Sequence, residues 1–229
     1  MLNSSIARGL SCKATHITAS KALNSFIYLA SQSPRRQELL KQIGVEFKLL
    51  LAQAGEDTES IETPLLYEKA CAYVERVTLA KSAVALERWG KSGLPWAPIL
   101  CADTTVSLPN SPGGGILGKP SDARDALRIL RMLSGKIHEV LTAVAITVKP
   151  NEPPISIVQI SEVQFADLPE ERIEAYIASG EPFGKAGAYG IQGGGSAFIP
   201  SIKGSYSGIM GLPLYETVQL LKRAQVHCI

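Results

Sequence analysis

The amino-acid sequence predicts an α/β fold in which a mixed, twisted sheet is flanked by helices in two lobes. Apolar runs of strand length alternate irregularly with segments of helical periodicity, whereas a purely parallel sheet requires a regular alternation. The apolar runs at 140–148 and 155–165 flank a short loop at 149–154 and predict a long antiparallel hairpin. The 229 residues are 45% hydrophobic and 19% charged, which excludes a mainly disordered protein and suffices for one domain or two small lobes.

The first structured unit is predicted to be a strand, a loop and a helix. An apolar run of strand type covers residues 26–30. Ser33 and Pro34 are typical of a helix N-cap and first helical residue, and Gly44 is typical of the position just past a helix end. The first helix is therefore expected to lie between Pro34 and Gly44.

The remaining elements follow from the same signals of periodicity, caps and breakers. The apolar stripe of the second predicted helix carries Lys81, and four Gly or Pro residues between 90 and 98 interrupt regular structure after it. The predicted elements are a helix at 63–84, a loop at 86–98, a strand at 99–102, helices at 122–133 and 169–180, and a last helix after Pro213.

Residues 1–26 differ in composition from the rest of the chain. They contain three basic residues, seven Ser or Thr and no Asp or Glu. This composition is typical of an organellar transit peptide, and a disordered tail is the alternative interpretation. We expect an N-terminal extension at 1–26 and a single domain at 27–229.

Charge, hydropathy and cysteine spacing exclude several classes of protein. A net charge of +2 is too small for a dedicated DNA- or RNA-binding protein. No apolar run reaches the roughly 18 residues that a membrane span requires. The four cysteines lie far apart, without the spacing of a zinc site or a disulfide framework. We expect a cytoplasmic protein, or one imported into an organelle through residues 1–26.

Several cations stand where an anion would stabilise them. Arg35 and Arg36 fall in the first turn of the first predicted helix, where the helix dipole disfavours cations, and Ser31 and Ser33 precede them. A bound phosphate would reverse that effect, although a solvated surface pair is the more common arrangement. Lys81, on an apolar stripe, needs either an anionic partner or a path for its ammonium group to water.

Three further segments carry candidate side chains. Asp103 ends the predicted strand at 99–102, where α/β folds place ligands, and it could hold a metal, activate water or simply cap a turn. Lys119 lies between Gly118 and Pro120, and its position alone assigns no role. The segment 184–195 contains six glycines, which allow close approach to a nucleotide or merely form turns; its ligand-directed candidates are Lys185, Tyr189 and Gln192.

Taken together, these segments resemble the signature blocks of the Maf nucleotide pyrophosphatases. The order and spacing of the blocks match across residues 27–224. The matching blocks are Leu29-Ala-Ser-Gln-Ser-Pro-Arg-Arg36, Ala102-Asp-Thr104, Leu117-Gly-Lys-Pro120, Leu133-Ser-Gly135 with His138, Lys185-Ala-Gly-Ala-Tyr-Gly-Ile-Gln-Gly193 and Gly211-Leu-Pro-Leu214.

The resemblance implies a fold related to the inosine triphosphate pyrophosphatases, a homodimer, and hydrolysis of a nucleoside triphosphate to its monophosphate and pyrophosphate. Within it, Asp103 matches the proton acceptor. The Tyr-Gly-Ile-Gln-Gly segment resembles the subfamily that acts on dTTP and UTP. Positions that distinguish substrates correspond to Arg35, Thr104 and Gln192, and positions that contact phosphates correspond to Ser31, Arg36, Lys81 and Lys119.

The resemblance also implies a divalent metal, Mg²⁺ or Mn²⁺, with Glu56 and Asp103 as its predicted ligands. The family's Asp-Glu pair before the second helix is matched here to Gly55-Glu56, so one carboxylate of the pair is absent. Two alternatives stay open: hydrolysis of modified pyrimidine nucleotides, and a non-catalytic nucleotide-binding regulator of cell division that uses the same pocket.

Overall fold

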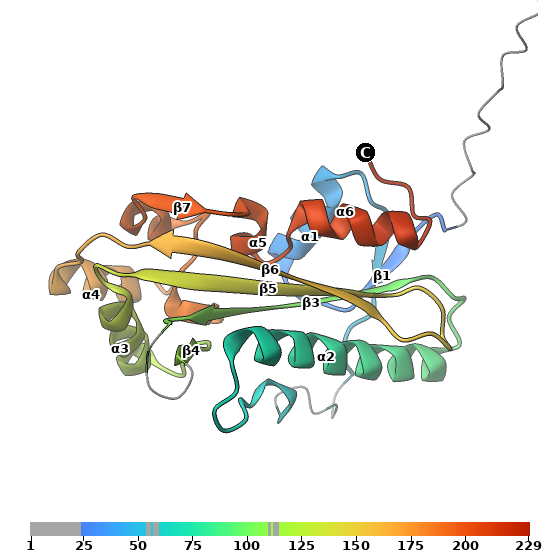
Figure 1. Cartoon of the computed structure of the whole chain (residues 1–229), viewed down its shortest axis with the longest axis horizontal. Coiled ribbons are helices and arrows are strands. Elements are labelled where there is room, and N and C mark those ends of the chain that lie inside the picture. Colours follow the sequence, from blue (N-terminus) through green and yellow to red (C-terminus); the bar gives the residue numbers. More distant parts are fainter. Residues whose placement is uncertain (1–23, 54–55, 57–59, 110, 112–114) are drawn as a thin grey trace, which may run out of the picture.

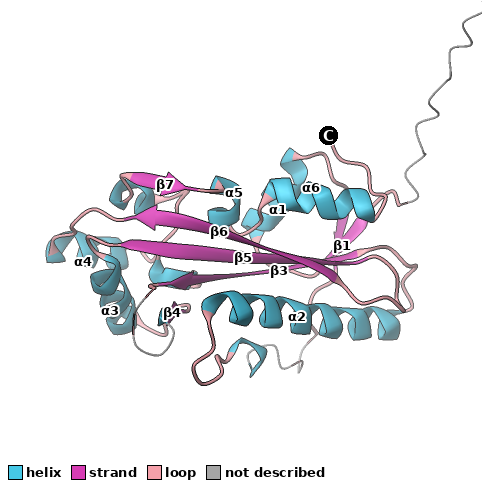
Figure 2. Cartoon of the chain, viewed as in Figure 1, coloured by secondary structure: helices cyan, strands magenta, loops and turns pink. Residues whose placement is uncertain are grey.

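The computed structural model describes residues 24–53, 56, 60–109, 111 and 115–229. They form one mixed sheet with helices on both of its faces (Figures 1 and 2), so the predicted α/β class is confirmed. The strands lie in the order β2-β1-β3-β5-β6-β7, and β4 pairs with β3. Their bounds are β1 Ile27–Leu29, β2 Phe47–Leu49, β3 Ile99–Ser107, β4 Ile116–Leu117, β5 Ile137–Thr147, β6 Ile155–Gln164 and β7 Ser201–Lys203.

Strand direction explains why the sheet is mixed. Strands β1, β2 and β3 are parallel to one another. The predicted hairpin follows, with β5 antiparallel to β3 and β6 antiparallel to β5. The helices are α1 Pro34–Gln42, α2 Ala70–Ser92, α3 Ala123–Leu133, α4 Glu170–Ala178, α5 Tyr206–Met210 and α6 Leu214–Arg223. Figure 1 shows β1, α1 and α6 gathered toward one end of the long strands and α3, α4 and β7 toward the other, which gives the two lobes.

Alternation along β3 directs successive side chains to opposite faces of the sheet. Cys101 packs with Ala85 of α2, whereas Leu100 and Ala102 pack in the core that α1 and α6 cover. The same alternation turns Asp103 toward α2 and the next residue, Thr104, toward α1 and α5. Because β1 pairs with β3 at Tyr28 and Leu29, and β4 pairs with it again from Val106, the intervening edge of β3 opens to ligands.

Helix α2 differs from its prediction at both ends. It begins at Ala70 rather than 63 and continues to Ser92 through a segment that we expected to be a loop. Gly90 alone costs only about 1 kcal/mol within a helix relative to alanine. The buried side chains of Ala85 and Arg88 hold this segment against the sheet, and the helix stops at Gly93, whose φ is +68°. The breaker that ends α2 is thus the second glycine.

Short elements and chain ends account for the other differences. Strand β3 continues to Ser107, five residues beyond its predicted end, and the three- to five-residue elements β2, β7 and α5 were not predicted. The predicted extension at 1–26 lies outside the described residues except for 24–26, and there Asn24 Nδ2 donates to the carbonyl of Ala224 at 2.8 Å. Of the helices that the structure describes, none has the length and apolarity needed to cross a membrane.

Candidate functional site

A cavity of about 550 Å³ opens at the free edge of β3. Segments from the whole length of the chain line it: the loop from β1 into α1, the turn that ends at Glu62, the middle of α2, the centre of β3, and the glycine-rich segment. All but one of the predicted site residues line this cavity, namely Ser31, Arg35, Arg36, Lys81, Asp103, Thr104, Lys119 and Gln192.

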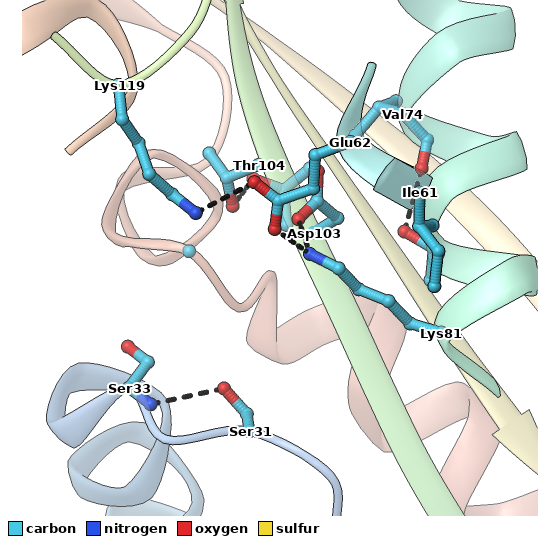
Figure 3. Close-up of polar contacts among 12 residues, drawn as sticks. Ser31, Ser33, Ile61, Glu62, Val74, Lys81, Asp103, Thr104 and Lys119 are labelled. Atoms are coloured by element: carbon cyan, nitrogen blue, oxygen red, sulfur yellow. Dashed lines mark hydrogen bonds and ion pairs between the residues drawn. The ribbon is translucent and has the colours of Figure 1, made fainter. Parts of the chain in front are cut away.

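Two carboxylates and two ammonium groups form a cluster at one side of the cavity (Figure 3). Lys81 Nζ lies 2.6 Å from Glu62 Oε1 and 2.6 Å from Asp103 Oδ1. Lys119 Nζ lies 2.9 Å from the other carboxylate oxygen, Glu62 Oε2. The formal charges of the four groups sum to zero, so each lysine neutralises a carboxylate that is partly withdrawn from water.

Lys81 reaches this cluster because of its place on α2. Val74 and Val77, seven and four residues before it, are fully buried against the sheet and share its face of the helix. The lysine stem therefore runs over the sheet, and its side chain is only 21% exposed. Of the two alternatives for Lys81, an anionic partner or a path for its ammonium group to water, the structure shows the first, with two such partners.

Glu62 was not among the predicted site residues. Burial alone would raise the pKa of its carboxyl, but hydrogen bonds and charges from Lys81 and Lys119 outweigh burial and lower it. The side chain is therefore ionised at neutral pH. Glu62 directly precedes Thr63-Pro64, the pair at which we expected a helix to start, and the sequence offers no other signal that separates it from its acidic neighbours.

Glu56, predicted to be a metal ligand, lies elsewhere. Both of its carboxylate oxygens accept from Arg88 Nε, at 3.0 Å each, and these hydrogen bonds lower the pKa of the Glu56 carboxyl to about 2. Arg88 also donates to the carbonyl of Leu50 at 2.8 Å, which ties the chain after β2 to α2. Because Glu56 does not line the cavity, the structure assigns it to an ion pair and leaves Glu62 beside Asp103.

Three hydrogen bonds fix the guanidinium group of Arg36. It donates from Nε to the carbonyl of Gly211 at 2.8 Å, from Nη1 to Ser31 Oγ at 3.1 Å, and from Nη2 to Thr104 Oγ1 at 3.4 Å. Burial lowers the pKa of Arg36, and the negative charge of Asp103 opposes that effect. A guanidinium group has five N–H donors, so two remain for a ligand in the cavity.

The glycine-rich segment also lines the cavity, next to the turn that carries Lys119. Gly187 has φ +71°, and a Cβ at this position would lie 2.6 Å from Val106 Cγ2, so the segment approaches β3 at a distance that requires glycine. The Gly187 amide donates to the carbonyl of Gly118 at 3.0 Å, which fixes the segment to the turn that carries Lys119. Gln192 lies exposed on this segment and lines the cavity.

Lys185 and Arg35 add positive charge on the same side. Both line the cavity, and burial together with the nearby charge of Arg35 lowers the pKa of Lys185. Burial also lowers the pKa of Arg35, with Glu38 opposing it. The cavity therefore presents cations from several sides, which suits a ligand with several negative charges.

Two carboxylates of the cavity, those of Glu62 and Asp103, are the residues that could hold a magnesium-type cation. No group of three or more His, Cys, Asp or Glu side chains suited to a metal occurs in the part of the chain that the structure describes. Mg²⁺ in phosphate sites is commonly bound through one or two carboxylates, with waters and substrate phosphates completing the shell. Glu62 and Asp103, both adjacent to Lys81, match that pattern.

Comparisons with known proteins agree with this arrangement. The family model described as Maf-like protein matches residues 26–224. The chain is 57% identical over 200 residues to the dTTP/UTP pyrophosphatase of Ralstonia nicotianae, which covers 87% of this chain and 94% of that protein. It is 53% identical over 205 residues to the dTTP/UTP pyrophosphatase of Cupriavidus metallidurans, covering 90% of this chain and 100% of that protein.

A solved structure, that of the Staphylococcus aureus Ham1 protein, is similar over 62% of this chain and 73% of that chain, with a TM-score of 0.38 and 14% identity. That likeness is too distant to carry weight, whereas the family match covers nearly all of the described residues. Because the match spans the β3 edge, the lysine–carboxylate cluster and the glycine-rich segment, the chain belongs to the Maf family.

Proposed function

We propose that this protein is a nucleoside triphosphate pyrophosphatase that hydrolyses dTTP and UTP to the monophosphate and pyrophosphate. The observation that carries the proposal is the cluster in which Lys81 bridges Glu62 and Asp103 at the edge of a polar cavity. Cleavage of a phosphoanhydride needs cations to neutralise the phosphates and a carboxylate to orient water. Relatives more than 50% identical are named for this activity.

The triphosphate lies among the cations of the cavity. Lys119, with a side chain that is 54% exposed, can turn from Glu62 to a phosphate oxygen with little loss of packing. Arg36, whose position is fixed by three hydrogen bonds, offers its remaining N–H groups to a second phosphate. Both contacts are to groups that every nucleoside triphosphate shares.

Asp103 acts as the general base. Its carboxylate accepts a proton from a water molecule as the water oxygen forms its bond to phosphorus, and the anhydride bond between the α and β phosphates breaks to release pyrophosphate. Lys81 stays within hydrogen-bond reach of Asp103 and keeps the carboxylate oriented. A Mg²⁺ or Mn²⁺ ion held by Glu62 and Asp103 would neutralise phosphate charge at this edge of the cavity.

Base selection falls to the glycine-rich side. The amide of Gln192 can both donate and accept, as the O4 and N3–H groups of thymine and uracil require. Arg35, which lines the same cavity, orients the base or the sugar. Because these contacts depend on the base, they affect dTTP and UTP more than other triphosphates.

The experiment that tests the proposal is a panel assay. Pyrophosphate release is measured with dTTP, UTP, CTP, GTP and modified pyrimidine triphosphates, each with Mg²⁺, with Mn²⁺ and with chelator. We expect turnover that requires the metal and is fastest with dTTP and UTP. A protein that binds dTTP but releases no pyrophosphate would instead support a non-catalytic regulator, which no observation on this structure favours.

Assembly and location complete the proposal. We infer a homodimer from the family resemblance, and size-exclusion chromatography with light scattering measures it directly. We infer a cytoplasmic location, with import through residues 1–26 as the alternative. Fluorescence microscopy of the full chain and of a chain that lacks residues 2–23 tests the location.

A further inference from the structure

From Arg36, a chain of hydrogen bonds runs away from the cavity along one face of the sheet, through Thr104 and Thr142 to α5. Thr104 Oγ1 on β3 lies 2.9 Å from Thr142 Oγ1 on the neighbouring strand β5. Thr142 Oγ1 in turn lies 2.8 Å from the carbonyl oxygen of Gly208 on α5. Thr142 is fully buried and does not line the cavity, so it has no contact with a ligand there.

The protons along this chain have one arrangement. A carbonyl oxygen carries no proton, so the hydrogen bond between Thr142 and Gly208 uses the only proton of the Thr142 hydroxyl. Thr104 must then donate its own proton to Thr142 Oγ1. The Thr104 hydroxyl therefore presents lone pairs to the cavity side, where the Arg36 Nη2 group donates to it.

Thr142 also supports a second anchor of Arg36. The carbonyl of Gly208, to which Thr142 donates, also accepts from the amide of Gly211 at 2.9 Å. The carbonyl of Gly211 is the acceptor for Arg36 Nε at 2.8 Å. Of the three groups that hold Arg36, Thr142 thus orients one directly and supports another through a single backbone turn.

We infer that Thr142 is a positioning residue for Arg36 and, through it, for the phosphates of the substrate. The inference rests on the proposed function for what Arg36 binds, but not for how Arg36 is held. A guanidinium group whose anchors are fixed before the ligand arrives loses little freedom on binding. Removal of the Thr142 hydroxyl frees the Thr104 proton and loosens two of the three anchors.

The test uses the full chain and a matched pair of substitutions on β5. Thr142→Val removes the hydroxyl with almost no change in shape, and Thr142→Ser retains it. The control is Thr147→Val on the same strand, which removes a buried hydroxyl 2.9 Å from Ser82 Oγ, and neither Thr147 nor Ser82 lines the cavity. Thr142→Val loses two hydrogen bonds and Thr147→Val loses one, so both melting temperatures should fall, that of Thr142→Val by the larger amount.

We expect Thr142→Val to lower kcat/KM about tenfold for every triphosphate, the size of effect typical of one lost positioning hydrogen bond. Thr142→Ser should stay within about threefold of the wild type. Thr147→Val should leave kcat/KM unchanged. An equal loss of kcat/KM in Thr142→Val and Thr147→Val would show a structural effect only and overturn the inference.

A double-mutant cycle with Arg36 gives the sharper readout. If Thr142 acts through Arg36, then Thr142→Val has no further effect on kcat/KM, or on the dissociation constant of a non-hydrolysable dTTP analogue, in an Arg36→Ala protein. The same tenfold effect in both backgrounds would refute the inference. If Thr142→Val does not fold, Thr142→Ala removes the same hydroxyl without changing a cavity-lining residue and should show the same loss of further effect in the Arg36→Ala protein.

Binding and turnover separate this inference from the proposed function. A wild-type protein that binds the analogue without releasing pyrophosphate from dTTP contradicts the proposed function. The cycle measured on the dissociation constant still decides whether Thr142 acts through Arg36.

Discussion

Replacement of Lys81 by methionine measures how much its two ion pairs contribute to the free energy of unfolding. Glu62 Oε1 and Asp103 Oδ1 each lie 2.6 Å from Lys81 Nζ, so the two oxygens are no more than about 5.2 Å apart. Two negative charges about 5 Å apart repel by about 3 kcal/mol at an effective dielectric constant near 20. Lys119 remains beside Glu62, whose side chain is 31% exposed. Solvent and Lys119 therefore reduce the expected loss of unfolding free energy to about 1–2 kcal/mol.

The loss of unfolding free energy in Lys81→Met depends on pH, and the lowered pKa of Glu62 determines the direction. The pKa of Glu62 is lowered in the folded protein, so its contribution to stability is present above its unfolded pKa and is lost as pH falls through the folded value. Lys81→Met removes much of that contribution and adds repulsion between ionised carboxylates. The difference from the wild type should be largest at neutral pH and should shrink as the pH falls below about 4.5, the ordinary pKa of a glutamate carboxyl, because Glu62 then takes up a proton.

The assay is urea unfolding of the wild type and Lys81→Met at a series of pH values, without nucleotide or metal. Lys149→Met is the control, because Lys149 forms an exposed ion pair with Glu152, with side chains 66% and 50% exposed. A pH-independent difference for Lys81→Met would show that the methionine disturbs packing instead. A difference no larger than that of the control would show that the bridge contributes little.

Four further predictions test the assignment of roles. Asp103→Asn should retain nucleotide binding and lower kcat by about 10²–10⁴, and near-normal turnover would remove Asp103 from the role of base. Gln192→Ala should lower kcat/KM for dTTP and UTP by a factor equivalent to about 1–3 kcal/mol, and much less for CTP or GTP; an equal loss for all four would exclude base recognition. Glu62→Gln should lower turnover at least about 100-fold and weaken the dependence on Mg²⁺, whereas Glu56→Gln should leave both unchanged. Because the pKa of Glu56 is about 2, its pairing with Arg88 should stabilise the wild type relative to Glu56→Gln above about pH 4.5, an advantage that fades as pH falls toward 2 in urea unfolding.

The location of the candidate site could be predicted from local sequence because several of its residues break local rules. Lys81 lies on an apolar helix face, and Arg36 is a cation in the first turn of a helix. Both irregularities are resolved by tertiary partners, Glu62 and Asp103 for the lysine and three oxygen acceptors for the arginine.

The identity of the second carboxylate could not be predicted, for a physical reason. Glu56 and Glu62 both precede α2, in a segment without periodicity. The local sequence therefore does not indicate which of the two side chains lines the cavity at β3. Their roles depend on distant partners: Arg88 is 32 residues from Glu56, and Lys81 and Lys119 are 19 and 57 residues from Glu62. The extension of β3 past Asp103 was missed similarly, because its pairing with β5 rather than its own apolar run maintains the strand to Ser107.

The central claim is that the cavity hydrolyses the bond between the α and β phosphates, and analysis of the products tests it most directly. The purified full chain is incubated with dTTP and Mg²⁺, and dTMP, dTDP, phosphate and pyrophosphate are quantified together. We predict one pyrophosphate for each dTMP from the start of the reaction. The Asp103→Asn protein should form the same products about 10²–10⁴ times more slowly. Formation of dTDP with phosphate, or binding of dTTP without any product, would contradict the claim.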